Sequence, residues 1–149
     1  MRTSTSLWAE VSGSELTTRL KAVPLFSSLS QRELRTLAER GWIGEIQPGH
    51  VLCSQGKRGD DFFVVLDGSA AVQRNGRKIG TLAAGQFFGE IALLDNMERT
   101  ATVTAVTPMR VFTLGRSDFK AALYEGGIAV KLLVTMAARL RASEAQLAD

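Results

Sequence analysis

The sequence predicts a mainly β fold, a double-stranded β-roll of the jelly-roll type flanked by helices at both ends. Between about residues 42 and 115, short apolar runs alternate with turn signals, which is typical of a double-sheet roll or small barrel. Asn75-Gly76, between two alternating runs, predicts a hairpin, because a type I′ turn needs positive φ at both central residues. Helical periodicity predicts helices at about 14–41 and 117–147, so all 149 residues are expected to form one domain.

The N-terminal helical region carries start and stop signals. Ser30 and Glu33 fit a capping box, and Gly41 fits the end of the helix that follows. An earlier short helix is expected from Ser14 to Ala22, before Pro24.

Two helices are expected at the other end, separated by Gly126-Gly127. Each glycine is about 1 kcal/mol less favourable than alanine in a helix interior, so this pair predicts a break, either a hinge or a simple turn. The helix beyond it is predicted to carry one apolar stripe formed by Leu133, Met136, Leu140 and Leu147.

Composition and charge exclude several classes of protein. The 18 basic and 15 acidic side chains are interspersed and give a net charge of +3, without the block of like charges typical of a nucleic-acid-binding arm. A single cysteine, Cys53, and a single histidine, His50, exclude a disulfide framework and leave no zinc set or catalytic triad, so no enzymatic activity is expected. No signal peptide or membrane-spanning run is found, and we expect a cytoplasmic protein that does not insert into membranes.

The stretch FFGEIALLDNMERTATVTA, which starts at Phe87, interrupts the β pattern with polar chemistry. Gly89 precedes Glu90 and a helix-compatible run, and the first N–H groups of such a helix lack partners and attract an anion such as phosphate. Arg99 supplies a planar fork of donors that grips two phosphate oxygens. Because a carboxylate repels phosphate, Glu90 is expected to accept hydrogen bonds from ligand hydroxyls, and together the two residues suit a sugar phosphate.

These polar residues could also have purely structural roles. Glu90 and Arg99 could form an ion pair on a loop, which would contribute only about 0 to 1 kcal/mol if exposed. Asp60 and Asp61, in the segment GKRGDD, are expected to be turn residues that bond their own backbone.

The segment FGEIALLDNMERTATV resembles the phosphate-binding cassette of cyclic nucleotide-binding domains, as found in the catabolite activator protein, cAMP-dependent kinase regulatory subunits and nucleotide-gated channels. The resemblance extends to PGHVLCSQGKRGDDFFVVLDGSAAVQRNG and LAAGQFFGE, and covers the chain from Phe26 to Leu114. Lys57 departs from the family, which often has an acidic residue after the QG turn, and this departure concerns only the turn.

The resemblance implies a role for each residue of the cassette. Glu90 would accept the ribose 2′-hydroxyl, Arg99 would bind the exocyclic phosphate oxygens, the backbone N–H groups of Ala92 and Thr100 would complete the cradle, and Gly89 would allow close approach. The implied ligand-binding set is Gly89, Glu90, Ile91, Ala92, Arg99, Thr100 and Ala101. Weaker candidates for the apolar wall beside the base and sugar are Val64, Leu66 and Val103. Separately from the resemblance, if Gly126-Gly127 is a hinge, the stripe of Leu133, Met136 and Leu140 can swing over the base as a lid, with Arg139 as a polar contact at its edge.

The resemblance also bears on the choice of nucleotide. In the family, a hydroxyl directly after the arginine can meet the 2-amino group of a guanine bound in the syn form, so Thr100 leaves cGMP open. We expect cAMP first, because hydroxyl residues at this position also occur in cAMP binders.

A sensor of this family would act by shifting the population of conformations of its C-terminal helices. No helix-turn-helix follows the last helix, so no nucleic-acid binding is expected of this chain alone, and its partner would be a second copy or a fused or separate effector domain. The alternative is a protein-interaction or dimerisation domain with the same fold and an unused pocket, whose C-terminal stripe forms half of a two-helix seam.

Overall fold

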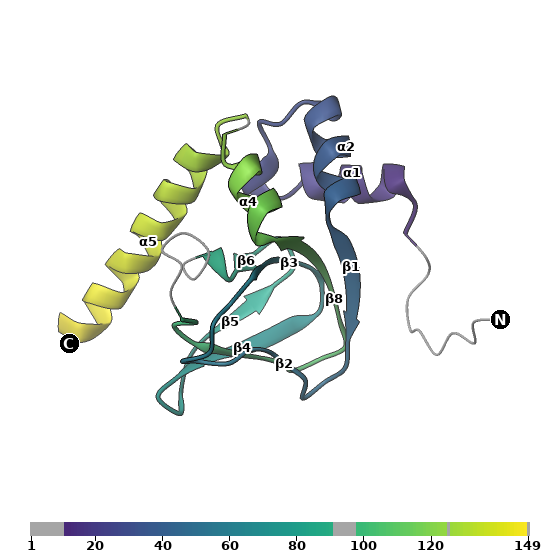
Figure 1. The fold of residues 1–149 in the computed structure, drawn as a ribbon. Coiled ribbons are helices and arrows are strands. Elements are labelled where there is room, and N and C mark those ends of the chain that lie inside the picture. Colours follow the sequence, from purple (N-terminus) through teal and green to yellow (C-terminus); the bar gives the residue numbers. More distant parts are fainter. Residues whose placement is uncertain (1–10, 91–97, 125, 149) are drawn as a thin grey trace.

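The computed structural model of the chain describes residues 11–90, 98–124 and 126–148. Within these residues it confirms the predicted fold class, with two four-stranded antiparallel sheets packed as a roll (Figure 1). The strands are β1 (Trp42–Ile46), β2 (Val51–Cys53), β3 (Asp61–Asp67), β4 (Ser69–Arg74), β5 (Arg77–Ala83), β6 (Phe87–Phe88), β7 (Thr102–Ala105) and β8 (Met109–Gly115). Their order is β1-β8-β3-β6 in one sheet and β2-β7-β4-β5 in the other.

The helices are α1 (Gly13–Lys21), the 3₁₀ helix η1 (Pro24–Phe26), α2 (Gln31–Arg40), α4 (Arg116–Ala122) and α5 (Ile128–Ala148). The helices α1, α2 and α4 cover one end of the roll, and α5 extends from that end along its side (Figure 1). The predicted capping box is confirmed, because the Ser30 hydroxyl accepts from the Glu33 amide and the Glu33 carboxylate accepts from the Ser30 amide.

The predicted hairpin joins β4 to β5. Arg74 and Arg77 are paired across it, and the two residues between them, Asn75 and Gly76, have φ values of 54° and 77°. This is the left-handed backbone that the Asn-Gly signal predicts.

Strand β3 contributes to two hydrophobic clusters, because successive side chains of a strand point to opposite faces. Phe62, Val64 and Leu66 join the cluster beneath the helices, with Phe112 among its fully buried members. The intervening residues join the cluster that also contains Val103. The burial of β3 on both faces explains its continuous apolar sequence.

The thiol of Cys53 is buried between the sheets, and this burial raises its pKa to about 11. Since the thiolate is the nucleophile, we expect Ellman's reagent at pH 8 to leave the native protein unlabelled. The same reagent should label one thiol per chain in denaturant, which serves as the control. Complete labelling of the native protein within seconds would contradict this burial.

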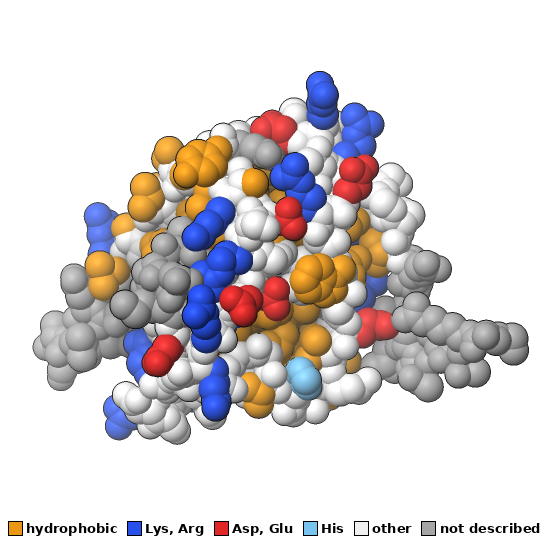
Figure 2. Space-filling model, in the orientation of Figure 1, with side chains coloured by type: hydrophobic (Ala, Val, Ile, Leu, Met, Phe, Trp, Pro, Cys, Tyr) orange, Lys and Arg blue, Asp and Glu red, His pale blue; other side chains and the backbone are white. Residues whose placement is uncertain are grey.

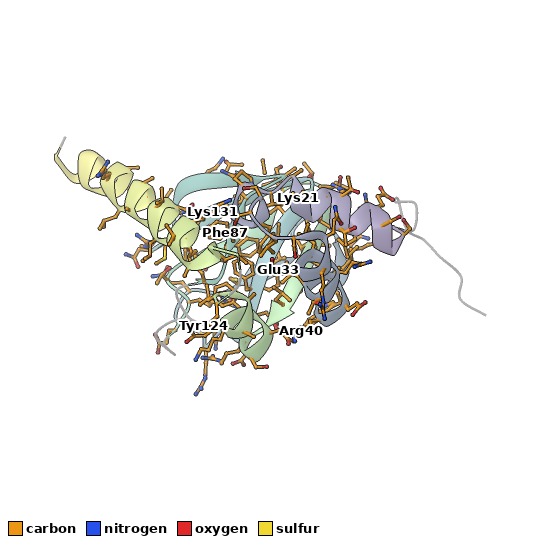
Figure 3. All side chains as sticks on the ribbon, turned by 90° about the horizontal axis from the view of Figure 1, so that it is seen from above. Lys21, Glu33, Arg40, Phe87, Tyr124 and Lys131 are labelled. Atoms are coloured by element: carbon orange, nitrogen blue, oxygen red, sulfur yellow. The ribbon has the colours of Figure 1, made fainter. Side chains whose placement is uncertain are left out.

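The glycine pair separates α4 from α5, as predicted, with φ values of 51° at Gly126 and 80° at Gly127. The junction is held against the segment before α2. A Cβ atom on Gly126 would lie 2.4 Å from Leu29 Cδ2. The Ser28 hydroxyl donates to the Gly126 carbonyl, and the Lys131 ammonium donates to Pro24 O at 3.3 Å. The start of α5 is therefore docked, and Figure 3 labels Lys131 on this part of the helix.

The predicted stripe on α5 is only partly correct. The face on the core consists of Ile128 and Leu132, with Met136 partly buried against them. Leu133 and Leu140 are instead 67% and 61% exposed. The helix is apolar on more than one side, so spacing alone does not decide which residues face the core. The side chain of Leu147 lies outside the described residues.

Candidate functional site

Glu90 directly follows Gly89 at the end of β6 and is buried, with 3% of its surface exposed. Burial raises the pKa of its carboxyl above the ordinary value, and the nearby cations Arg139 and Arg99 offset this only in part. A buried carboxylate of this kind is a strong acceptor for hydroxyl or cationic donors.

Arg99 is also buried, at 8% exposure, and its guanidinium donates to two backbone carbonyls. Nη1 lies 2.9 Å from Gly89 O, and Nη2 lies 2.8 Å from Asp61 O. The guanidinium also lies 5.7 Å from the centre of the Phe63 ring. The direct Glu90–Arg99 ion pair considered as an alternative is not formed in the described structure, because the Glu90 carboxylate pairs with Arg139.

The electrostatics of Arg99 favour an anionic ligand. Both described hydrogen-bond acceptors of its guanidinium are neutral carbonyl oxygens, so the buried positive charge has no anionic hydrogen-bond partner among the described residues. The Asp61 and Glu90 carboxylates interact with this charge only through space, and a phosphate able to accept the same two donors would add a direct anionic partner.

Two glycines provide the space that Arg99 occupies. At Gly89, where φ is +93°, a Cβ atom would lie 2.6 Å from Arg99 Nη1 and 2.8 Å from Asp61 O. At Gly59, a Cβ atom would lie 2.0 Å from Arg99 Nε. Gly89 is part of the predicted cassette, whereas Gly59 lies in the segment GKRGDD, whose expected role was an ordinary turn. The only signal at Gly59 is a glycine just before the aromatic strand β3.

Arg139 brings the middle of α5 to the site. Its Nη1 donates to Glu90 Oε1 at 2.7 Å, and its Nη2 donates to Phe87 O at 2.8 Å. Its guanidinium also lies 4.5 Å from the centre of the Phe87 ring, a cation–π contact. Arg139 is a predicted lid residue, but its pairing with Glu90 was not predicted from the sequence.

The other predicted site residues are distributed around this centre. Thr100 is exposed, and its carbonyl accepts from Arg74 Nε at 3.1 Å. Ala101 is half-buried. Ile91 and Ala92 lie outside the described residues. The wall and lid candidates are split between the core, which holds Val64, Leu66, Val103 and in part Met136, and the surface, which holds Leu140.

An open groove with a volume of about 380 Å³ runs between α5 and the roll. Its lining includes Phe87 and Arg139, and Arg139 is the residue that pairs with Glu90. The described residues contain no group of His, Cys, Asp or Glu side chains that could hold a metal ion. None of the described helices combines the length and apolar character needed to cross a membrane.

Comparison with protein families decides which family this geometry represents. A family model described as "Cyclic nucleotide-binding domain" matches residues 31–125, more than half of the chain. The chain belongs to the cyclic nucleotide-binding domain family.

A cAMP-dependent protein kinase regulatory subunit from Yarrowia lipolytica is 40% identical over 103 residues, which cover 68% of this chain and 28% of that protein. The chain thus spans little more than a quarter of this relative. The relative is a regulatory subunit, in agreement with the prediction that the chain is not an enzyme.

Solved structures of cyclic nucleotide-binding domains confirm the fold. The regulatory domain of Toxoplasma gondii PKA, crystallised with cAMP, is 28% identical, with a TM-score of 0.76 over 85% of this chain and 50% of that chain. The regulatory subunit of a cAMP-independent protein kinase A from Trypanosoma brucei is 25% identical, with a TM-score of 0.74 over 83% of this chain and 46% of that chain. Since one of these structures contains cAMP and the other belongs to a cAMP-independent kinase, the fold alone does not decide the ligand.

Proposed function

We propose that this cyclic nucleotide-binding domain is a regulatory sensor that binds cAMP, with cGMP as the second candidate. The observation that carries the proposal is the buried Arg99 guanidinium, which has only neutral acceptors among the described residues. Glu90 is buried next to Gly89, whose carbonyl accepts from Arg99, and it supplies the acceptor that a ribose hydroxyl needs. The cAMP-dependent relative from Yarrowia lipolytica and the cAMP-bound structure from Toxoplasma gondii support the choice of ligand.

Binding would redistribute the hydrogen bonds of the site. A cyclic phosphate would take donors that Arg99 now gives to Gly89 O and Asp61 O. The ribose hydroxyl would share the Glu90 carboxylate, of which Arg139 occupies Oε1. The first exchange replaces bonds from the guanidinium to neutral carbonyls by bonds between opposite charges, and the second gives the ribose hydroxyl an ionised acceptor.

Thermal melting with cAMP, cGMP and 5′-AMP tests the proposal. Free ligand at 100 times its dissociation constant adds about 2.7 kcal/mol to the free energy of unfolding, so the melting temperature should rise with a cyclic nucleotide and not with 5′-AMP. The larger shift is expected with cAMP. If neither cyclic nucleotide raises the melting temperature at millimolar concentration, the sensor proposal is wrong.

The helix α5 is expected to respond to the ligand, because Arg139 joins it to Glu90. Hydrogen exchange across Ile128–Ala148 should slow when cAMP binds, as the helix closes over the base. In Arg139→Ala this slowing should be lost, whereas Arg141→Ala, which changes an exposed arginine of the same helix, should retain it. Protection confined to residues 89–101, with α5 unchanged, would show that α5 serves packing and is no lid.

A second function, assembly of two copies through α5, is favoured by the surface of that helix. The apolar side chains that α5 exposes follow the spacing of a two-helix seam: Val130, Leu133, Val134 and Leu140. Figure 2 shows hydrophobic side chains gathered on the side of the molecule where α4 and α5 lie. Sedimentation at increasing concentration should reveal a dimer that Leu133→Glu abolishes. A monomer at all concentrations would remove this function.

A further inference from the structure

A second arginine contacts the turn that holds Arg99. Arg116 is the first residue of α4, and its Nη2 donates to Gly59 O at 2.7 Å and to Asp60 Oδ1 at 2.9 Å. The residues on either side of Asp60 are those that touch Arg99: Gly59 packs against its guanidinium, and Asp61 O accepts from it. One three-residue turn therefore lies between two arginines.

We propose that Arg116 is a positioning residue for phosphate binding, which holds the 59–61 turn so that Arg99 faces the ligand. This inference rests on the proposed nucleotide function and extends it to a residue outside the cassette. Arg116 does not need to touch the nucleotide, because it acts through the turn.

The strand register explains why Arg116 reaches this turn. Asp61 is paired with Gly115 where β3 and β8 lie side by side, so the residue after Gly115 falls beside the residue before Asp61. The side chain of Arg116 is only 21% exposed, whereas that of Asp60 is 72% exposed. The turn itself is therefore close to solvent, and its hydrogen bonds to the more buried Arg116 restrict its motion.

Charge gives Arg116 a second effect on Arg99. The Asp60 carboxylate is paired with Arg116 at 2.9 Å. Without that partner, a free carboxylate would remain between the two residues that contact Arg99. A carboxylate competes with phosphate for a guanidinium, since both accept two parallel hydrogen bonds from it. Arg116 thus restrains the turn and also pairs with the Asp60 carboxylate, which would otherwise compete with phosphate for Arg99.

The position of Arg116 also connects the site to the C-terminal helices. When a phosphate takes the donor that Arg99 gives to Asp61 O, the turn loses one of its restraints. Arg116 transmits the resulting shift to the first residue of α4, on the side of the fold from which α5 continues.

A double-mutant cycle tests this role. Arg116→Ala should weaken cAMP binding about five- to tenfold, within the range of coupling between residues that share a network. Affinity for adenosine, which lacks the phosphate, should stay within about twofold of the unmodified chain. In an Arg99→Lys background, where the bidentate geometry is already lost, Arg116→Ala should add less than about a twofold loss.

Two further variants separate positioning from general stability. Arg116→Lys, which keeps the charge and one set of donors, should retain most of the affinity even if Arg116→Ala folds poorly. Asp60→Asn combined with Arg116→Ala should recover part of the lost affinity, because the competing carboxylate is gone. Arg40→Ala is the matched control. Arg40 lies in α2 and contacts Asp118 of α4, the helix of Arg116, at 4.0 Å, so this change removes an ion pair of α4 without touching the turn.

The outcomes distinguish this inference from the function on which it rests. If the unmodified chain binds cAMP but Arg116→Ala lowers adenosine and cAMP affinity equally, or costs the same factor with and without Arg99→Lys, Arg116 has a structural role only and the inference is wrong. If the unmodified chain binds neither cyclic nucleotide, the sensor function and the positioning role both fail.

Discussion

Replacing Arg99 by lysine is expected to lower the affinity for cAMP about ten- to a hundredfold, since hydrogen bonds to charged groups contribute roughly 1.5 to 3 kcal/mol each. Arg99 uses two nitrogens, Nη1 and Nη2, to reach two separate acceptors. Lysine keeps the positive charge but presents a single nitrogen, so it cannot bind two phosphate oxygens in the same way. Equilibrium titration with a fluorescent cyclic nucleotide, displaced by cAMP, measures the change.

Two comparisons show whether the loss for Arg99→Lys belongs to the phosphate. Binding of adenosine should be nearly unaffected, because adenosine lacks the group that Arg99 would hold. Glu90→Gln should cost less than Arg99→Lys, since the amide oxygen still accepts from the ribose hydroxyl. Equal cAMP affinity for Arg99→Lys and the unmodified chain would remove Arg99 from the binding site.

Gly59→Ala is expected to impair binding as strongly, although Gly59 lies outside the cassette. A Cβ atom there would lie 2.0 Å from Arg99 Nε and 2.7 Å from its Cδ, so the arginine must move. A lost hydrogen bond to a charged group costs roughly 1.5 to 3 kcal/mol, and we therefore expect a loss of at least about tenfold for cAMP. The same displacement titration measures it.

The matched control for Gly59→Ala is Gly80→Ala in β5, where an added Cβ atom meets nothing within 4 Å. It should bind cAMP like the unmodified chain. The melting temperature of each variant without ligand shows whether the fold is intact. A folded Gly59→Ala variant that binds cAMP within twofold of the unmodified chain would show that Arg99 does not act from the position described.

Local signals account for the parts of the fold that the sequence predicts well. The capping box at Ser30 and the Asn75-Gly76 hairpin depend on residues close together in the chain, and both are confirmed. The break at Gly126-Gly127 follows from the same kind of signal. The faces of α5 were predicted less well, because the choice between Met136 and its neighbours depends on what lies opposite the helix.

The candidate site shows the same division. The chemistry of one motif was enough to predict Glu90 and Arg99 as site residues. Both are buried beside Gly89, which precedes Glu90 in the chain and whose carbonyl accepts from Arg99. The contacts of Arg99 with Gly59 and of Arg139 with Glu90 were not predicted. They join segments 40 and 49 residues apart, and such distant partners are set by the strand register and the packing of α5, which no short stretch of sequence records.

Calorimetric titration of the unmodified chain with cAMP, cGMP and 5′-AMP tests the central claim most directly, because it counts sites and needs no labelled ligand. We predict one site per chain, tightest binding for cAMP, weaker binding for cGMP, and no measurable binding of 5′-AMP over the same concentration range. Equal affinity for cAMP and 5′-AMP, or no heat of binding with either cyclic nucleotide at millimolar concentration, would contradict a cyclic nucleotide sensor built on Glu90 and Arg99.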